Sequence, residues 1–438
     1  MIDLRVIRER PEETKAAIAT LHTTAPIDEI LVLDDRRRTL LTAVEAMKAT
    51  RNEGSKTVSK TNDSGERSRL IGEMRELGER IVSLDNEVAE LDTSLNDLLL
   101  RVPNLPTPDV PIGMDERENV VISEHNNRRQ FSFAPKPHWE LGERLGIIDF
   151  ERGAKVSGSR FYFLRGDGAR LQRALITWML DVHTRDHGFT EIYPPYLVLE
   201  DMLVGTGNLP KFAETLFRDI EGEKWLIPTA EVPLTNMYRD EILEQAQLPI
   251  YLVAYSACFR REQISAGREV RGIKRGYQFD KVELVKFVRP DRSKEELDSL
   301  ILAARAILDG LELPYRLLQI CTGDLSFTAA NTIDLECWAA GTEEWLEVSS
   351  CSSFLDFQAR RANLRFRPEG GGRPQFLHTL NGSGLALPRT LIAIIEQYQR
   401  EDGTIEIPAV LQPYMRGQTE IGSQFPIAPS SNASQYKN

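Results

Sequence analysis

The stretch FRREQISAGREVRGIKRGYQFDKVE, residues 259 to 283, concentrates positive charge within an acidic chain. Six cationic side chains fall between residues 260 and 275, although the 438-residue chain has a net charge of -12. Guanidinium groups bind phosphate oxygens bidentately, so this cluster indicates a polyanionic small ligand, with ATP the obvious candidate. A solvated basic loop on an ordinary sheet is the alternative that this segment alone leaves open.

A strand is expected directly after this loop, and alternate side chains of a strand share one face. Here that face carries Phe279, Lys281, Glu283, Val285 and Phe287. An aromatic ring and a carboxylate therefore lie on the same surface, four residues or roughly 13 Å apart. The ring suits a stacked base, and the carboxylate suits an amine or a hydroxyl.

The stretch resembles the second signature motif of class II aminoacyl-tRNA synthetases, in the form typical of seryl-tRNA synthetases. Four further segments resemble the same family in the same order, and the resemblance runs from the N-terminus to about residue 416. They are TAEVPLT (229–235), EVSSCS (347–352), DFQARR (356–361) and HTLNGSGLA (378–386). The resemblance implies an α+β fold: an antiparallel-sheet catalytic domain flanked by helices, preceded by a long antiparallel coiled-coil hairpin.

The composition, 41% hydrophobic and 27% charged residues, is that of a soluble globular protein. No apolar run reaches the ~18 to 20 residues of a membrane span, and the N-terminus does not read as a signal peptide. We therefore expect a cytoplasmic protein without membrane association. The four cysteines and six histidines are scattered without zinc-ligand spacing, so we predict no zinc.

The clearest periodicity lies between residues 70 and 98, where apolar residues recur in steps of four and three. This seam consists of Leu70, Met74, Leu77, Ile81, Leu84, Val88, Leu91, Leu95 and Leu98. A weaker seam runs through Ile30, Leu33, Leu40, Val44 and Met47, and residues 61–65 between the two seams read as a turn. The pattern predicts a coiled-coil hairpin over about residues 28–100, with a second helix roughly 43 Å long that should project as an arm.

The distal part of this arm, residues 36 to 80, carries eleven Lys and Arg against seven acids, a balance of +4. Outer faces of coiled coils are commonly charged, and plain solvation is the alternative interpretation. The family resemblance implies an arm that grasps tRNA by neutralising phosphates. The predicted tRNA contacts are Arg36, Arg37, Arg38, Lys48, Arg51, Lys56, Lys60, Arg67, Arg69, Arg75 and Arg80.

We expect four regions along the chain. An N-terminal tRNA-binding arm domain covers residues 1–102, and a proline-rich linker covers residues 103–111. The catalytic domain covers residues 112–416, and a disordered tail rich in Ser, Asn, Pro and Gln covers residues 417–438. Within the catalytic domain, an amphipathic helix followed by the strand at residues 189–196 resembles the first family motif and implies a homodimer.

The resemblance also assigns the site. As catalytic residues it implies Arg260, Glu283 and Arg389. For serine it implies Thr229, Ala230, Glu231, Arg260, Glu283, Asn381 and Ser383. For ATP it implies Arg260, Arg261, Glu262, Arg275, Gly276, Phe279, Glu347, Val348, Ser349, Ser350 and Arg389. Glu347 and Ser350 would hold Mg²⁺, but a regular strand puts these two side chains on opposite faces, so the strand must bend or end between them.

The implied reaction is activation of L-serine with ATP to seryl-adenylate, followed by transfer of serine to the terminal adenosine of tRNA(Ser). Whether tRNA(Sec) is also charged stays open. Two alternatives remain: a synthetase-like paralogue with a binding or structural role, and an enzyme that transfers serine to another acceptor. Four residues depart from the commonest family pattern without removing an assigned ligand: Arg261, Gly276, Tyr277 and Pro388.

Overall fold

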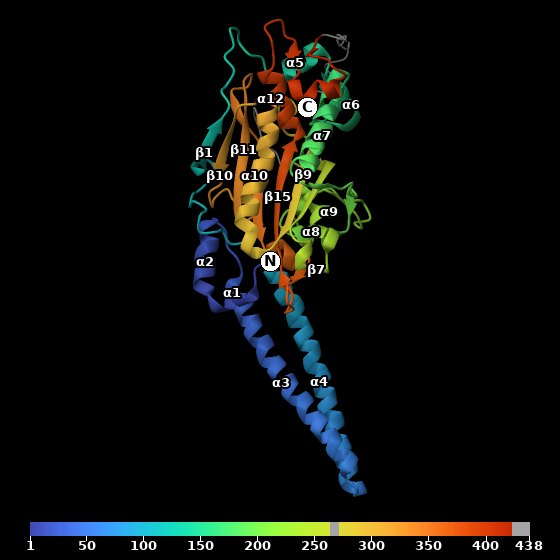
Figure 1. Ribbon diagram of the computed structural model, residues 1–438. Helices are drawn as coiled ribbons and strands as arrows, with labels where there is room; N and C mark the ends of the chain where they lie inside the picture. Colours follow the sequence, from blue (N-terminus) through green and yellow to red (C-terminus); the bar gives the residue numbers. More distant parts are fainter. Residues whose placement is uncertain (263–270, 423–438) are drawn as a thin grey trace. The chain divides into compact units, whose positions relative to one another are not determined.

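The computed structural model describes residues 1–262 and 271–422, which form two compact units. The first unit contains residues 1–19 and 23–103, and the second contains residues 20–22 and the described residues from 104 onward (Figure 1). Each unit is described by itself below. Arg268 of the cationic stretch and residues 423–438 of the predicted tail lie outside the described residues.

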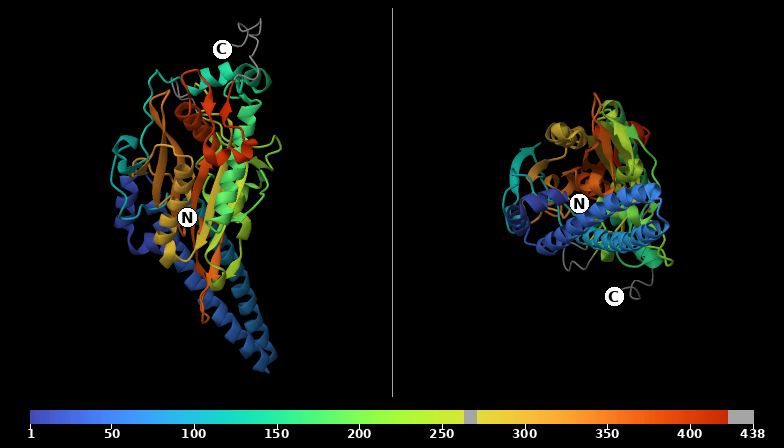
Figure 2. Two further views of the ribbon diagram at one scale, coloured as in Figure 1. Left: turned by 45° about the horizontal axis from the view of Figure 1, so that its top comes forward. Right: turned by 90° about the horizontal axis from the view of Figure 1, so that it is seen from below.

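The first unit is helical and is dominated by two long helices, α3 (Ile27–Lys60) and α4 (Ser64–Leu99). They lie side by side along their length, as Figures 1 and 2 show. Residues 61–63 connect them, and the Asp63 carboxylate caps α4 by accepting a hydrogen bond of 2.7 Å from the Glu66 backbone N–H. The predicted helical hairpin is confirmed.

The seam of α4 is buried over its second half, at Ile81, Val88, Leu91, Leu95 and Leu98. Two shorter helices, α1 (Leu4–Glu9) and α2 (Pro11–Thr20), precede the hairpin. Helix α1 is connected to α3 by an ion pair. The Arg8 guanidinium donates two hydrogen bonds of 2.7 and 2.9 Å to the buried carboxylate of Asp34.

The second unit is built on an eight-stranded sheet within the described residues. Neighbouring strands are antiparallel, except that β4 and β8 are parallel. In spatial order the strands are β1 (Val120–His125), β10 (Tyr315–Gln319), β11 (Asn331–Ala339), β12 (Glu344–Leu355), β15 (His378–Ala386), β9 (Gln278–Val288), β8 (Ile250–Phe259) and β4 (Thr190–Glu191). The predicted α+β fold with an antiparallel-dominated sheet is confirmed.

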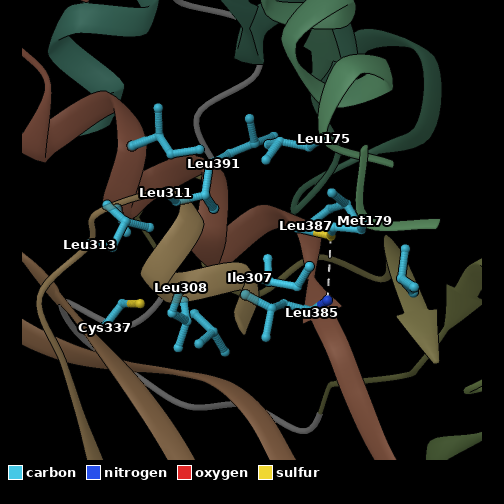
Figure 3. Packing of buried hydrophobic residues seen from close by; sticks show 14 of the residues in the cluster. Leu175, Met179, Ile307, Leu308, Leu311, Leu313, Cys337, Leu385, Leu387 and Leu391 are labelled. Carbon is cyan, nitrogen blue, oxygen red and sulfur yellow. Dashed lines mark hydrogen bonds between the residues drawn. The ribbon is translucent and has the colours of Figure 1, made fainter. Parts of the chain in front are cut away.

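Three helices cover one face of this sheet: α7 (Asp167–Arg185), α10 (Ser293–Gly310) and α12 (Leu387–Gln397) (Figure 1). Their apolar sides pack with even-numbered residues of β9, including Val282 and Leu284, in one large core. Figure 3 shows this core from close by, including Met179 of α7, whose sulfur accepts a hydrogen bond of 3.4 Å from the Leu385 backbone N–H.

The opposite face of β9 is divided between core and cavity. Val285 and Phe287 pack in a second apolar cluster with residues of α9 (Glu231–Thr235) and α11 (Phe357–Arg361). Further along the same face, Phe279, Lys281 and Glu283 border a cavity. The predicted alternation of this strand is confirmed, and it places the candidate site on the face away from α7, α10 and α12.

Smaller elements complete the second unit. Among the described residues, the α-helices of this unit not yet named are α5 (His138–Leu145), α6 (Phe150–Ser157) and α8 (Glu200–Thr206). Short strand pairings join β2 (Ile148–Asp149) with β3 (Phe163–Leu164), β5 (Leu197–Val198) with β6 (Trp225–Leu226), β16 (Ile405–Glu406) with β17 (Glu420–Ile421), and β13 (Arg365–Arg367) with both β7 (Ile242–Glu244) and β14 (Gln375–Phe376). Strand β17 thus falls within the first residues of the predicted tail.

Asn104, from the predicted linker, is hydrogen-bonded within the second unit. Its side-chain amide donates to the carbonyls of Thr328 and Phe354, each at 2.9 Å.

Every helix in residues 1–262 and 271–422 is too short or too polar to cross a bilayer.

Candidate active site

A cavity of about 360 Å³ opens on the second unit, between the sheet and the beginnings of α9 and α12. Its volume falls in the usual range for small-molecule sites, roughly 300 to 1,000 Å³. The residues around it are mostly polar or charged. They are Glu231, Arg260, Glu262, Lys274, Arg275, Gly276, Phe279, Lys281, Glu283, Ser326, Thr328, Glu347, Ser350, Ser352, Phe354, Asn381, Ser383, Ala386, Pro388 and Arg389.

Arg260 lies where β8 ends, and the backbone fixes its position. Its N–H donates to the carbonyl of Tyr277 at 3.0 Å, and its side-chain Nε donates to the carbonyl of Pro228 at 3.2 Å. The guanidinium carbon lies 5.1 Å from the centre of the Phe279 ring. A fixed cation and an aromatic ring therefore border the same part of the cavity.

Glu283 is the most buried carboxylate of the cavity, with 1% of its surface exposed. It forms an ion pair with Lys281 and accepts a hydrogen bond of 3.1 Å from the Thr229 hydroxyl. Burial raises the pKa of Glu283, while the Lys281 ammonium and the Thr229 hydroxyl act in the opposite direction. Lys281 thus partly offsets the desolvation of this carboxylate.

Glu231 is the second carboxylate at this end of the cavity, at the start of α9. Its Oε1 accepts a hydrogen bond of 2.6 Å from the side-chain amide of Gln358. Burial, and next to it the negative charge of Glu283, raise the pKa of Glu231 to about 7. Asn381 and Ser383 of β15 also line the cavity, and Ser383 pairs with Glu283 across the adjacent strands.

Strand β12 contributes Glu347 and Ser350 to the cavity because it contains a bulge. Opposite it in β11, Leu335 pairs with Ser349 and Glu336 pairs with Glu347, so Val348 is an extra residue. Because of this bulge, the side chains of Glu347 and Ser350 both lie on the cavity side of the strand. The predicted bend between residues 347 and 350 is therefore present.

Arg389 stands in the first turn of α12, directly after Pro388. Its Nη1 donates to the backbone carbonyl of Glu347 at 2.7 Å and lies 3.3 Å from the Glu347 carboxylate. On another wall, Lys274 is paired with Glu344 at 2.6 Å and Arg275 with Glu262 at 3.5 Å. Arg389, Lys274 and Arg275 thus pair with acids other than Glu231 and Glu283, whereas Lys281 pairs with Glu283.

Comparison with known proteins decides the family. The model of the seryl-tRNA synthetase N-terminal domain matches residues 1–106, and that of the tRNA synthetase class II core domain (G, H, P, S and T) matches residues 214–398. The serine–tRNA ligase of Thermomicrobium roseum is 62% identical over 424 residues, covering 97% of this chain and 95% of the relative. The chain belongs to the seryl-tRNA synthetase family.

Solved structures agree with this assignment to the seryl-tRNA synthetases. The crystal structure of seryl-tRNA synthetase from Pyrococcus horikoshii complexed with ATP has a TM-score of 0.91 and 38% identity, covering 97% of this chain and all of that one. The cytoplasmic serine–tRNA ligase from Naegleria fowleri in complex with AMP has a TM-score of 0.86 and 29% identity, covering 97% and 99%. The predictions of family, fold class and synthetase activity are confirmed, and the two alternative functions are not favoured.

Most residues that the sequence assigned to the site of this synthetase lie around the one cavity, but five do not line it. Thr229 is buried, and its hydroxyl donates a hydrogen bond to the Glu283 carboxylate. Ala230 is buried in the second apolar cluster. The Arg261 guanidinium lies 4.9 Å from the centre of the Phe217 ring. Val348 is a core residue, and the buried Ser349 hydroxyl donates to the Ser383 carbonyl at 2.6 Å.

Several residues that line the cavity or contact its lining were not assigned a role from the sequence. Lys281 lies on the same strand face as Phe279 and Glu283, so the alternation of side chains along the strand already indicated that Lys281 would be near the site. Ser326 and Thr328 come from the segment between β10 and β11, where nothing in the local pattern indicated a site. Gln358 belongs to a quoted family segment, but its contact with Glu231 joins residues 127 positions apart.

Proposed function

We propose that this synthetase forms seryl-adenylate in the cavity described above, with serine at the Glu231 and Glu283 end and ATP between Phe279 and Arg389. The observation that carries the proposal is the position of Arg260. It is a fixed cation beside both an aromatic ring and the end of the cavity that holds the Glu231 and Glu283 carboxylates. The two related synthetases described above, one complexed with ATP and the other with AMP, support a nucleotide in this cavity.

In the proposed reaction, an oxygen of the serine carboxylate attacks the α-phosphorus of ATP, and the bond to pyrophosphate breaks. The protein forms no covalent bond, so positioning and charge neutralisation provide the catalysis. Arg260 would bridge the serine carboxylate and the α-phosphate. Glu262 would contact the nucleotide, Phe279 would stack its base, and Arg275 and Arg389 would neutralise the phosphates.

Serine would be recognised mainly by Glu283, which can accept both the ammonium and the hydroxyl. Glu231, Thr229, Asn381 and Ser383 would complete the polar surroundings. An analogue without the hydroxyl leaves buried polar groups unpaired, and a site of this kind discriminates by a factor of ~10⁴ or more.

The oxygen donors of β12 fit a hard divalent cation. Glu347 and Ser350 lie on the same side of the bulged strand, and Oδ1 of the adjacent Asp334 is buried without a hydrogen-bond partner among the described residues. We infer that Glu347 and Ser350 hold Mg²⁺, which when bound neutralises phosphate charge. The described residues contain no group of three His, Cys, Asp or Glu side chains arranged for a metal.

For the rest of the molecule, we propose that the α3–α4 hairpin binds tRNA(Ser) and that α7 and β4 form a homodimer interface. Charging of tRNA(Sec) and a cytoplasmic location remain predictions from the sequence. These proposals name the partners, tRNA and a second copy of the chain, that the family membership supports.

The first test is serine-dependent exchange of labelled pyrophosphate into ATP. The wild-type enzyme should catalyse it, and Arg260→Ala should reduce kcat/KM by roughly 10²-fold or more, because the developing charge loses its cation. Arg218→Ala is the matched control, since Arg218 is an exposed arginine packed against Trp225. No exchange by wild-type enzyme, or equal exchange by the two variants, would refute the proposal.

A further inference from the structure

We propose that Gln358 is a positioning residue for serine recognition, whose buried side-chain amide holds the Glu231 carboxylate ionised and directed into the cavity. The inference rests on the proposed function of the cavity, and it adds a residue that does not itself line the cavity. Gln358 belongs to α11, and 0% of its surface is exposed.

Three hydrogen bonds fix the Gln358 amide. Its Nε2 donates to Glu231 Oε1 at 2.6 Å and to the backbone carbonyl of Thr206 at 3.2 Å. Its Oε1 accepts from the Thr379 hydroxyl at 2.7 Å. The amide nitrogen thus faces two acceptors, a carboxylate and a carbonyl, and rotation of the amide by 180° would place its oxygen against both.

This arrangement matters because Glu231 stands in a crowded electrostatic environment. Glu283 and Lys281 face it from β9, and Arg260 faces it from the end of β8. Burial and the Glu283 charge disfavour its ionised form, whereas Lys281, Arg260 and the Gln358 hydrogen bond favour it. Gln358 contributes this support without adding a charge that would compete with Arg260 for the serine carboxylate.

The geometry has a direct consequence for serine binding. An ionised Glu231 attracts the serine ammonium, and a protonated one does not. Affinity for serine that depends on Glu231 is therefore present above its pKa and is lost as the pH falls through it. Removing the Gln358 donor raises the pKa of Glu231 and moves this loss to higher pH.

The test is Gln358→Met, which keeps the side-chain length and removes the amide. In pyrophosphate exchange near pH 7, we expect KM for serine to rise roughly tenfold or more, as for loss of a hydrogen bond to a charged group. KM for ATP and kcat should stay within about twofold of wild type. The deficit in serine KM should shrink steadily between about pH 6 and about pH 8.5, as Glu231 ionises.

Two further variants make the result specific. Gln397→Met removes another buried glutamine, 1% exposed, which donates to the Trp338 carbonyl at 2.9 Å and does not border the cavity. It should leave serine KM unchanged at every pH. Thr379→Val removes only the bond that orients Gln358, and it should raise serine KM in the same direction by a smaller factor. If Gln358→Met fails to fold, Thr379→Val provides the test in its place.

Glu231→Gln separates this inference from the proposed function. If Glu231→Gln leaves serine KM unchanged, the proposed serine role of Glu231 fails, and the inference fails with it. If Glu231→Gln raises serine KM but Gln358→Met and Thr379→Val do not, the inference alone is overturned. If the increase in serine KM is independent of pH, or if KM for ATP increases equally, Gln358 only stabilises the fold.

Discussion

At the scale of single residues, Lys281 decides how Glu283 can work. The two side chains form an ion pair at the inner end of the cavity, and both are almost fully buried. An unpaired carboxylate at this depth would bind a proton, since burial is the largest influence on the pKa of Glu283 and raises it. Lys281 therefore keeps available the negative charge that the proposed serine site needs.

We predict that Lys281→Met makes serine binding strongly dependent on pH. Without the ammonium, the pKa of Glu283 rises further, so the carboxylate is neutral at pH values where it is ionised in the wild type. KM for serine should increase at least about tenfold near pH 7 and recover as the pH rises. The measurement is the pH profile of serine KM in pyrophosphate exchange.

The control lies on the same strand. Lys286 is also buried and pairs with Glu296 at 2.9 Å, but even-numbered residues of β9 face the helices. Lys286→Met should lower the free energy of unfolding by about 3 to 5 kcal/mol, as for a broken buried ion pair, and leave the pH profile of serine KM unchanged. If both variants shift that profile alike, the assignment of Lys281 is wrong.

At the scale of elements, the side-chain face of β9 followed from local spacing, whereas a bend in β12 was expected only because the family resemblance assigned Glu347 and Ser350 to one ion. Alternation is a local property, so residues 279, 281 and 283 could be placed on one side from their spacing alone. The bulge at Val348 depends on how β12 pairs with β11, which no local pattern records. For the same reason Ser326, Thr328 and the Gln358 contact could not be predicted, because each depends on segments far apart in the chain.

Helix α12 illustrates such a long-range connection. The Glu396 carboxylate is fully buried and accepts hydrogen bonds from the backbone N–H groups of His138, Gly341 and Thr342, and His138 Nδ1 lies 2.8 Å from it. The other ring nitrogen of His138 accepts from the Ile273 backbone N–H at 3.2 Å. One histidine thus connects α12 to the segment that carries Lys274 and Arg275.

We predict that His138→Ala loosens this segment. The free energy of unfolding should fall by about 1 to 3 kcal/mol, because buried groups of Glu396 and Ile273 lose their partner. Amide hydrogen exchange of residues 271–275 should accelerate relative to β9. His378→Ala is the control, since His378 Nδ1 is buried without a hydrogen-bond partner among the described residues. Equal acceleration in both variants would contradict the connection.

At the scale of the whole molecule, the arm cations fall into two groups. Arg36, Arg37, Arg38, Lys48, Arg69 and Arg75 each form an ion pair with a carboxylate of the hairpin. In the described chain, no ion pair engages the other five predicted tRNA contacts, which are Arg51, Lys56, Lys60, Arg67 and Arg80. These five residues, which lie between positions 51 and 80, form the unpaired group.

If the hairpin binds tRNA as we propose, the unpaired group should dominate the electrostatic attraction, since its charges are not already neutralised. We predict that the triple variant K56Q/K60Q/R67Q weakens tRNA(Ser) binding and lowers charging kcat/KM by at least about tenfold, with pyrophosphate exchange unchanged. The slope of log binding constant against log salt concentration should become shallower by about one for each phosphate that the variant no longer neutralises. The matched triple R36Q/R37Q/K48Q removes paired charges and should have a much smaller effect on both quantities. Equal losses would mean that net charge alone matters, and no loss in either variant would remove the arm from the tRNA interface.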